Sequence, residues 1–302
     1  ELSGELSLTM KVRATEGRLF FEQQPAGAQN FKLFVRDGDR PARVLIDPTK
    51  LEIDGKHVSL DWWEPAVSGR HVAYGLSPAG SEASTAHVLE VESGKILETR
   101  IPNTDYGITG WLPDGAGFFY IQFIGERGTP TFYWDSVVKL HLRRGLYEQI
   151  PMKEIQVGVV RPVAGTSQAV VEVRDARPER AVWTVQLPEL LAGKPRFRAV
   201  ASADELVVDV AATGDDLFLI SNRDRPRGRV LVTSIENPSL ATATEVLPQS
   251  ALVADDVYPI RGGALVRMMD GGVQRLMRVS RREAASSVPL PFEGSIRGVF
   301  SS

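Results

Sequence analysis

Short apolar runs alternate with small-residue turns along the whole chain. In each repeat an apolar or alternating run leads into a turn that contains Gly, and a second run rich in Val, Phe, Tyr and Leu follows. The turns are centred at residues 16–17, 68–69, 114–115, 165, 213–214 and 262–263, and from the second turn on they recur at intervals of 46 to 51 residues. Gly and Asp favour such turns because they tolerate a left-handed backbone or bond to it. The pattern therefore predicts β-hairpins at a fixed period.

Each hairpin is followed by two further runs. The third run has sequences such as "AHVLEVES" and "RVLVTSI", and the fourth is shorter, as in "ILETRI". This gives four short strands in each repeat. Helical periodicity is weak throughout, and the best helix candidate is the segment "LPELLAGK" at residues 187–194.

Four-stranded repeats of about 40–50 residues are typical of a β-propeller. A blade that is apolar on both faces needs a neighbour on each side to cover it. We expect large side chains to fill the space between blades, namely Trp62, Trp63, Trp111, Phe118, Phe119, Trp183 and Phe218. Six repeats begin near Thr9, Leu60, Tyr106, Gln156, Glu205 and Val253, and "SIRGVFSS" at residues 295–302 resembles the start of a seventh. We predict an all-β propeller of antiparallel blades, with residues 1–302 forming one domain.

The composition of the chain excludes several classes of partner and of site. The 302 residues carry a net charge of −3, so we expect neither a nucleic-acid nor an anionic membrane partner. No apolar run approaches the roughly 18 residues that span a bilayer. The chain has no cysteine, which excludes disulfides, thiolate nucleophiles and Cys-ligated zinc within it. A cytoplasmic and a periplasmic location both remain open.

One serine lies in a glycine-rich context that invites comparison with a hydrolase nucleophile. Ser77 lies between Gly75 and Gly80 in "GLSPAG". A nucleophile elbow requires Gly-x-Ser-x-Gly between a strand and a helix, but here the spacing differs and Pro78 follows the serine directly. We interpret Ser77 as part of the scaffold and predict no catalytic residue in this chain.

The histidines give no metal-binding pattern. None of the four forms the His-x-His or His-x-x-x-His pairing that holds a metal. We predict no metal site and no other cofactor. The histidines are His57, His71, His87 and His141, and we interpret His71 and His87 as packed or paired strand residues.

Three segments resemble the N-terminal propeller of the prolyl oligopeptidase family of serine peptidases. They are "ARVLIDPTKL" at residues 42–51, "HVAYGLSPAGSE" at residues 71–82 and "SNRDRPRGRVLV" at residues 221–232. The second is the most specific of the three. Thr49 stands in the first segment where this family commonly has Asn.

The resemblance implies a seven-bladed propeller joined to an α/β-hydrolase domain that carries a Ser-Asp-His triad. In that family the propeller covers the active site and restricts cleavage to short proline-containing peptides. The implied partners are the hydrolase domain of the same polypeptide and a short peptide substrate. We expect this chain to be a propeller truncated before its last blade, inactive alone, and prone to self-associate or to bind its missing portion.

The resemblance also implies two residues that line the substrate cleft. By position, Phe119 in "GFFYIQF" corresponds to an aromatic wall, and Arg180 in "PERAVW" corresponds to an arginine of the cleft. The match at Arg180 requires a shift of one residue. Core packing for Phe119 and a surface ion pair for Arg180 are equally consistent with the sequence.

Two other functions remain open. A stand-alone propeller that binds a protein or peptide on one rim would be distinguished by a reading frame that ends after one more blade instead of continuing into a hydrolase domain. A calcium-dependent propeller enzyme, such as a lactonase, needs acidic residues at the start of several inner strands. Those runs begin with Trp, Ile, Val and Val, which makes this the least supported alternative.

Overall fold

The computed structural model describes residues 6–134, 136–142, 145–151, 156–291, 293–296 and 298–299. These residues form β-strands, turns and loops, with short 3-10 turns and one brief α-helix, α1 (Leu187–Leu191). The all-β prediction is confirmed, and α1 lies within the segment predicted to be helical. The chain divides into two compact units, the first ending at Pro151 and the second following it.

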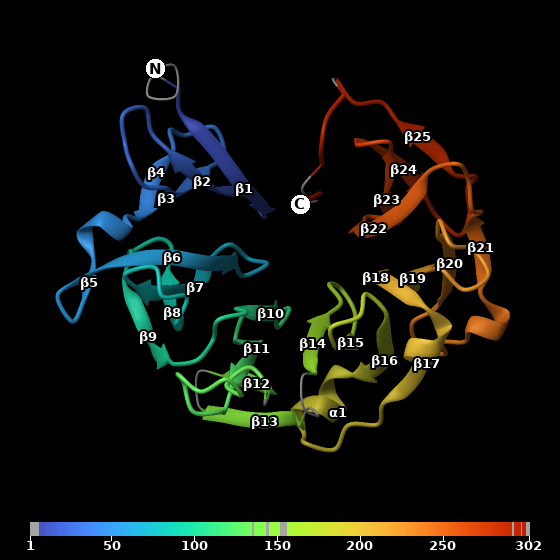
Figure 1. Ribbon diagram of the computed structural model, residues 1–302, viewed down its shortest axis with the longest axis horizontal. Helices are drawn as coiled ribbons and strands as arrows, with labels where there is room; N and C mark the ends of the chain where they lie inside the picture. Colours follow the sequence, from blue (N-terminus) through green and yellow to red (C-terminus); the bar gives the residue numbers. More distant parts are fainter. Residues whose placement is uncertain are drawn as a thin grey trace. The chain divides into compact units, whose positions relative to one another are not determined.

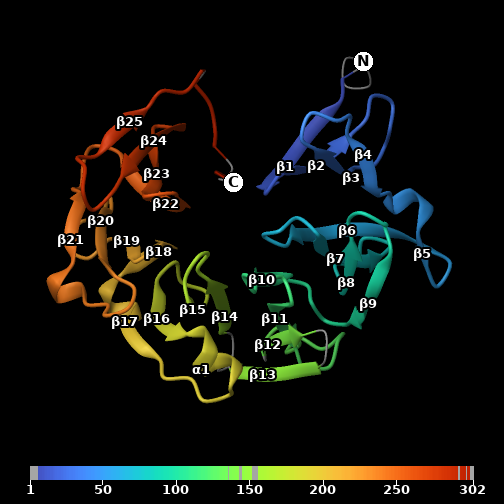
Figure 2. The same ribbon diagram turned by 180° about the vertical axis from the view of Figure 1, so that it is seen from behind.

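The first unit contains three antiparallel sheets, which we number as blades 1 to 3. In Figures 1 and 2 blade 2 lies between the other two. Blade 1 consists of β1 (Leu8–Thr15), β2 (Arg18–Gln24), β3 (Lys32–Asp37) and β4 (Arg43–Ile46). Blade 2 consists of β5 (Glu52–Ile53), β6 (Lys56–Pro65), β7 (His71–Pro78), β8 (Thr85–Glu90) and β9 (Ile96–Ile101). Blade 3 consists of β10 (Ile108–Trp111), β11 (Gly117–Phe123), β12 (Ser136–Leu142) and β13 (Gly145–Pro151).

The second unit contains three four-stranded antiparallel sheets, blades 4 to 6. Blade 5 lies between the other two in both views (Figures 1 and 2). Blade 4 consists of β14 (Val157–Pro162), β15 (Gln168–Arg174), β16 (Arg180–Gln186) and β17 (Arg198–Ala201). Blade 5 consists of β18 (Val207–Thr213), β19 (Asp216–Ser221), β20 (Arg229–Ser234) and β21 (Thr244–Leu247). Blade 6 consists of β22 (Val253–Ile260), β23 (Gly263–Asp270), β24 (Val273–Val279) and β25 (Ser286–Val288).

The predicted turns join the first two strands of blade 1 and of blades 3 to 6, and in blade 2, where the short β5 comes first, the turn joins β6 to β7. Each turn has a glycine in the left-handed region, with φ between +54° and +79°, which is the conformation that favours glycine. These glycines are Gly17, Gly69, Gly115, Gly165, Gly214 and Gly262. The six predicted repeats are therefore confirmed in number and phase.

The predicted seventh blade is not confirmed. Residues 293–296 and 298–299 form no strand, and the other residues of the segment 295–302 lie outside the described part of the chain. The Gln274 N–H donates to the Gly294 carbonyl at 3.0 Å, and Arg267 donates to the Ile296 carbonyl at 2.9 Å. The described part of this segment is thus held against blade 6.

The hydrophobic core of each unit lies between neighbouring blades. Blades 1 and 2 share a cluster that includes Phe20, Trp63 and Tyr74, and blades 5 and 6 share one that includes Phe218 and Val266. Of the seven residues predicted to fill these spaces, five are buried and two, Trp62 and Trp183, are partly buried. Packing between blades is therefore the main source of buried apolar surface, as the repeat pattern predicted.

Polar side chains also cross between blades 1 and 2. Arg18 donates to Asp37 of its own blade at 2.6 Å, and to the Gly69 carbonyl and Glu92 of blade 2, each at 2.8 Å. The buried Trp63 indole N–H donates to Glu22 at 2.7 Å. These contacts fix the two blades relative to each other, because a buried polar group that loses its partner is costly.

Two adjacent glycines of blade 6 are needed for different reasons, and this difference is testable. A Cβ on Gly263 would lie 2.3 Å from the Val279 carbonyl oxygen of the neighbouring strand, whereas Gly262 has φ +79° and open space around it. We expect Gly263→Ala to destabilise the chain by about 3 kcal/mol through this steric clash with backbone. Thermal unfolding of the purified chain measures the loss.

Gly262→Asn is the matched control, since Asn tolerates the left-handed region. It should cost less than about 1 kcal/mol. Equal losses for the two variants would contradict the steric explanation for Gly263.

A half-buried histidine of blade 2 makes stability depend on pH. His87 stacks on Tyr74 with ring centroids 5.4 Å apart, and its buried Nε2 has no hydrogen-bond partner among the described residues. Burial, and secondarily the charge of Arg100, lowers the pKa of His87 below its usual 6.5. The unfolded chain therefore binds this proton at a higher pH than the folded chain does. This contribution to stability is present above pH 6.5 and is lost as the pH falls toward the lowered pKa.

We expect His87→Phe to make the fall in stability between pH 7 and pH 5 shallower. Urea unfolding at several pH values for both proteins measures the difference, and the carboxylates that titrate in the same range are common to both. Parallel pH profiles would show that His87 does not contribute.

Candidate functional site

The serine of the glycine-rich segment binds a half-buried carboxylate. Ser77 is fully buried in β7, and its hydroxyl donates to Asp61 Oδ1 at 2.9 Å. The Ser84 hydroxyl donates to the other oxygen of Asp61. Burial raises the pKa of Asp61, and these two hydrogen bonds oppose that rise. Ser77 thus holds a carboxylate within blade 2, in agreement with the scaffold interpretation.

The structure places Phe119, a predicted cleft residue, in the interior of blade 3. It lies in β11, opposite Gly110 on one side and Leu140 on the other, and its exposed fraction is 0%. Its ring offers no accessible surface in this structure. Its role as an aromatic wall of a substrate cleft stays a prediction.

The second predicted residue, Arg180, links two blades of the second unit. It begins β16, and its Nη1 donates to Glu172 of blade 4 and to Asp209 of blade 5, both at 2.6 Å. Its side chain is only 13% exposed. Arg180 therefore belongs to a partly buried ionic network and is more than a surface pair. Its contact with a substrate stays a prediction, and Phe119 lies in the other unit.

Glu172 is the centre of this network. Its carboxylate is 0% exposed and contacts three guanidinium groups, those of Arg161, Arg174 at 3.0 Å and Arg180 at 2.6 Å. The antiparallel register explains the convergence, because Arg174 pairs with Arg180 and lies two residues from Glu172 on the same face of β15. We call these four residues the arginine cluster.

The arginine cluster carries excess positive charge. Burial lowers the pKa of Arg161 and of Arg174 to about 10, and the other arginines contribute to this shift, yet both groups remain protonated at neutral pH. Asp209 adds a second carboxylate, which also accepts the Val257 N–H at 2.8 Å. Three cations then contact two anions, and the charge of a further carboxylate, Asp256, also acts on Arg174. The guanidinium groups are the part of the cluster that could contact an acidic group.

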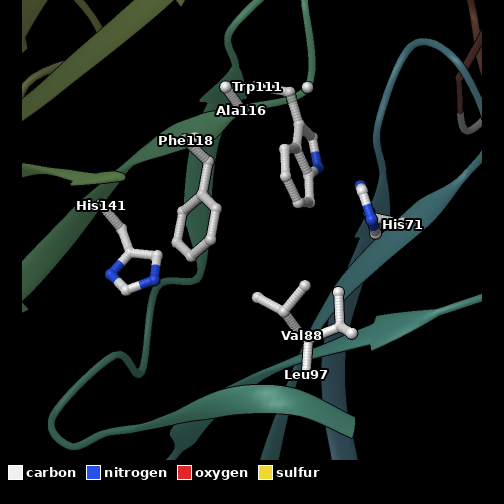
Figure 3. A pocket seen from close by; sticks show the side chains of 9 residues that line it. His71, Val88, Leu97, Trp111, Ala116, Phe118 and His141 are labelled. Atoms are coloured by element: carbon white, nitrogen blue, oxygen red, sulfur yellow. The ribbon is translucent and has the colours of Figure 1, made fainter. Parts of the chain in front are cut away.

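A second candidate site is an aromatic pocket between blades 2 and 3 (Figure 3). The cavity has a volume of about 240 Å³. It is lined by His71, Val88, Leu97, Trp111, Gly115, Ala116, Gly117, Phe118 and His141. The labelled side chains in Figure 3 come from both blades and converge on the same space. We call it the blade 2–3 pocket.

Neither a metal site nor a membrane-spanning helix emerges from the part of the chain that the structure describes. Those residues contain no group of three or more His, Asp or Glu side chains placed to hold a metal ion. No helix among them is long and apolar enough to cross a bilayer.

The comparisons with known proteins identify the fold family. A model of the family described as "Prolyl oligopeptidase, N-terminal beta-propeller domain" matches residues 9–301. The chain belongs to this family.

Curated relatives agree with this assignment. The prolyl endopeptidase of Elizabethkingia meningoseptica is 25% identical over 225 residues, which are 72% of this chain and 32% of that protein. Prolyl oligopeptidase A of Amanita bisporigera is 21% identical and matches 68% of this chain and 30% of its own length. This propeller chain therefore spans about a third of the length of the relatives it matches.

Solved structures share the propeller fold. A chain from a structural and mechanistic study of two prolyl endopeptidases superposes with a TM-score of 0.81 at 18% identity, covering 96% of this chain and 44% of that one. Prolyl oligopeptidase B of Galerina marginata, bound to a 35mer hydrolysis and macrocyclization substrate, gives a TM-score of 0.79 at 14% identity, covering 97% and 45%. The predicted β-propeller fold is confirmed.

The sequence did not single out the other members of the arginine cluster. A usable signal was present, since Glu172 and Arg174 are the two charges in the mainly apolar run of β15, "QAVVEVR". Charges on the face of a strand that packs against another sheet must be paired. Their partners, however, come from neighbouring strands that only the fold brings close.

The arginine cluster predicts a large effect for its central carboxylate. We expect Glu172→Gln to lower the free energy of unfolding by at least about 2 kcal/mol, because three guanidinium groups lose their shared counter-charge. Urea unfolding of the purified chain measures this change.

Asp175→Asn is the matched control in the same blade. Asp175 pairs with Arg177 at 3.0 Å on the exposed surface, where ion pairs contribute little. We expect no measurable change in the urea midpoint. If Glu172→Gln leaves the free energy of unfolding unchanged, the cluster contributes nothing to folding.

Proposed function

We propose that this chain is the propeller of a prolyl-oligopeptidase-like serine endopeptidase that cleaves short proline-containing peptides. In this proposal the hydrolase domain of the same polypeptide carries the Ser-Asp-His triad, and the propeller limits the size of the substrate that reaches it. The observation that carries the proposal is the family match across residues 9–301. The names of the relatives, prolyl endopeptidase and prolyl oligopeptidase, supply the reaction class.

The contribution of the propeller is steric and electrostatic in this proposal. The packed blades exclude folded proteins, and the arginine cluster presents a rigid cationic surface to the peptide. Arg180 is held by two carboxylates at 2.6 Å, so its position costs little ordering entropy when a substrate arrives. Phe119 would support the surface of blade 3 from within that blade.

A second candidate is a stand-alone propeller that binds a protein or peptide. One observation favours it, namely a patch of exposed large apolar side chains around the loop between β11 and β12. Its members are Tyr106, 55% exposed, Ile124, 58%, Tyr133, 45%, and Trp134, 42%. The reading frame after residue 302 distinguishes the two candidates, because only the first requires a hydrolase domain to follow.

The size-filter proposal can be tested at the contact between blades 1 and 2. In the polypeptide that joins this propeller to its hydrolase domain, Arg18→Ala removes the bonds to Gly69 and Glu92. If the contact between blades 1 and 2 loses about 1 kcal/mol of stability, the population in which these two blades are separated rises about fivefold. We expect cleavage of a prolyl bond within a long unfolded protein to rise about fivefold relative to that of a short prolyl reporter.

Arg36→Ala is the control, because Arg36 is an exposed arginine of the same blade for which no ion pair is found in the described part of the chain. It should leave the ratio unchanged. If Arg18→Ala also leaves the ratio unchanged while thermal unfolding confirms a weakened propeller, the size-filter role is wrong. Cleavage of the short reporter by the 302-residue chain alone would overturn the assignment of the triad to another domain.

A further inference from the structure

We propose that the blade 2–3 pocket binds a neutral aromatic ring system of one or two fused rings. This inference rests on the pocket itself and is independent of the proposed peptidase function. Six blade strands supply the large side chains around the cavity, β7, β8 and β9 from blade 2 and β10, β11 and β12 from blade 3. A bound ring would therefore contact both blades at once (Figure 3).

The walls of the pocket are mainly ring faces and edges. Trp111 meets Phe118 edge to face, with centroids 5.1 Å apart and planes at 65°. His71 lies nearly parallel to Trp111, at 6.4 Å and 21°, and His141 lies 5.0 Å from Phe118. Aromatic rings favour such offset and edge-to-face contacts over contacts with aliphatic groups of equal area. The side chains of Val88 and Leu97 complete the apolar lining.

The charge of the lining selects a neutral ligand. None of the nine residues that line the pocket is an Asp, Glu, Lys or Arg. An ammonium group at the ring would lose hydration without gaining a counter-charge, which is costly, and a carboxylate would gain one only where His71 or His141 is protonated. An uncharged ring has no such cost and gains the apolar contact area.

The volume of the pocket sets the size of the ligand. An apolar cavity of about 150 Å³ holds benzene. At about 240 Å³, this pocket has room for a substituted benzene or for a fused pair of rings such as indole. A peptide could fill it with only one side chain.

The walls are fixed before a ligand arrives. The Trp111 indole N–H donates to the Glu64 carbonyl of blade 2 at 3.0 Å, which holds the ring in one orientation. The turn beside it is closed by hydrogen bonds from Gly115 N–H to the Leu112 carbonyl and from Ala116 N–H to Asp114, each at 2.9 Å. Binding therefore requires little ordering of the protein, which favours affinity for a small ligand.

The direct test uses 5-fluoroindole and the 302-residue chain. We expect saturable binding in ¹⁹F NMR, with a Kd of roughly 0.1–1 mM for a ligand of this size. Of the five tryptophan indole N–H resonances, that of Trp111 should shift most, and Trp111→Phe assigns it. Absence of saturable binding would overturn the proposal.

A variant that blocks the pocket tests the location. Ala116 lies exposed in the turn at the pocket, so Ala116→Trp should close it without altering the core and should weaken binding at least tenfold. Asp215→Trp places the same side chain at the corresponding position of the β18–β19 turn and should leave binding within twofold of the original chain. If Ala116→Trp does not fold, Val88→Phe is used in its place, because it fills the pocket from blade 2. Unchanged binding by either folded variant would overturn the proposal.

Further ligands test the preference for a neutral ring and show whether the ring belongs to a free small molecule or to a peptide side chain. Indole-3-carboxylate and tryptamine should bind at least tenfold more weakly than 5-fluoroindole, and equal binding would overturn the requirement for neutrality. N-acetyl-tryptophanamide carries the same ring on a peptide-like backbone. If it binds at the Trp111 resonance, a peptide side chain can occupy the pocket. If only 5-fluoroindole binds there, the proposal holds for a free small molecule.

Discussion

The whole molecule depends on one constraint, which is that the sheet of each blade is apolar on both faces and must be covered on both. The second strands show this directly. In β7, β11 and β19 almost every residue is buried, whichever face it points to. An isolated sheet of this kind would expose both faces to water, and sheets of this kind become stable only when they stack. The clusters between neighbouring blades are therefore where the folding free energy of each unit is concentrated.

This constraint also decides which polar groups are tolerated between blades. A charge that enters the space between two sheets needs a partner, and in several cases that partner comes from the neighbouring blade. Arg18 reaches Glu92, and Arg180 reaches Asp209. Such pairs add little net stability compared with an apolar contact, but losing one partner is expensive. They fix the position of one blade against the next more strictly than apolar contacts alone would.

The sequence predicted the features that depend on neighbouring residues in the chain. It did not predict the contacts that form between strands. The repeat period, the glycine at each first turn and the helix at α1 depend on neighbours in the chain, so the pattern of residues contained them. Five blades have a register shift between the two strands that the predicted turn joins, for example between Leu60 and Trp62. These shifts depend on strand pairing and were not predictable. The contacts of the arginine cluster have the same character, because Arg180 and its partner outside the cluster, Asp209, are 29 residues apart in the chain. His71 was predicted to be a packed residue, and only the fold shows that it faces His141 across a cavity.

The high structural similarity at low identity follows from the same constraint. A TM-score of 0.81 at 18% identity means that most positions need only the right polarity at the right phase of the repeat. A position that obeys only this rule can exchange one large apolar side chain for another without changing the fold. The fold therefore transfers between relatives, whereas a residue's role does not transfer with it. Phe119 is an example, since it is fully buried in this chain and its role in a substrate cleft stays a prediction. The blade 2–3 pocket and the arginine cluster depend on side chains for which the packing rule alone sets no identity, and their function follows from their own contacts.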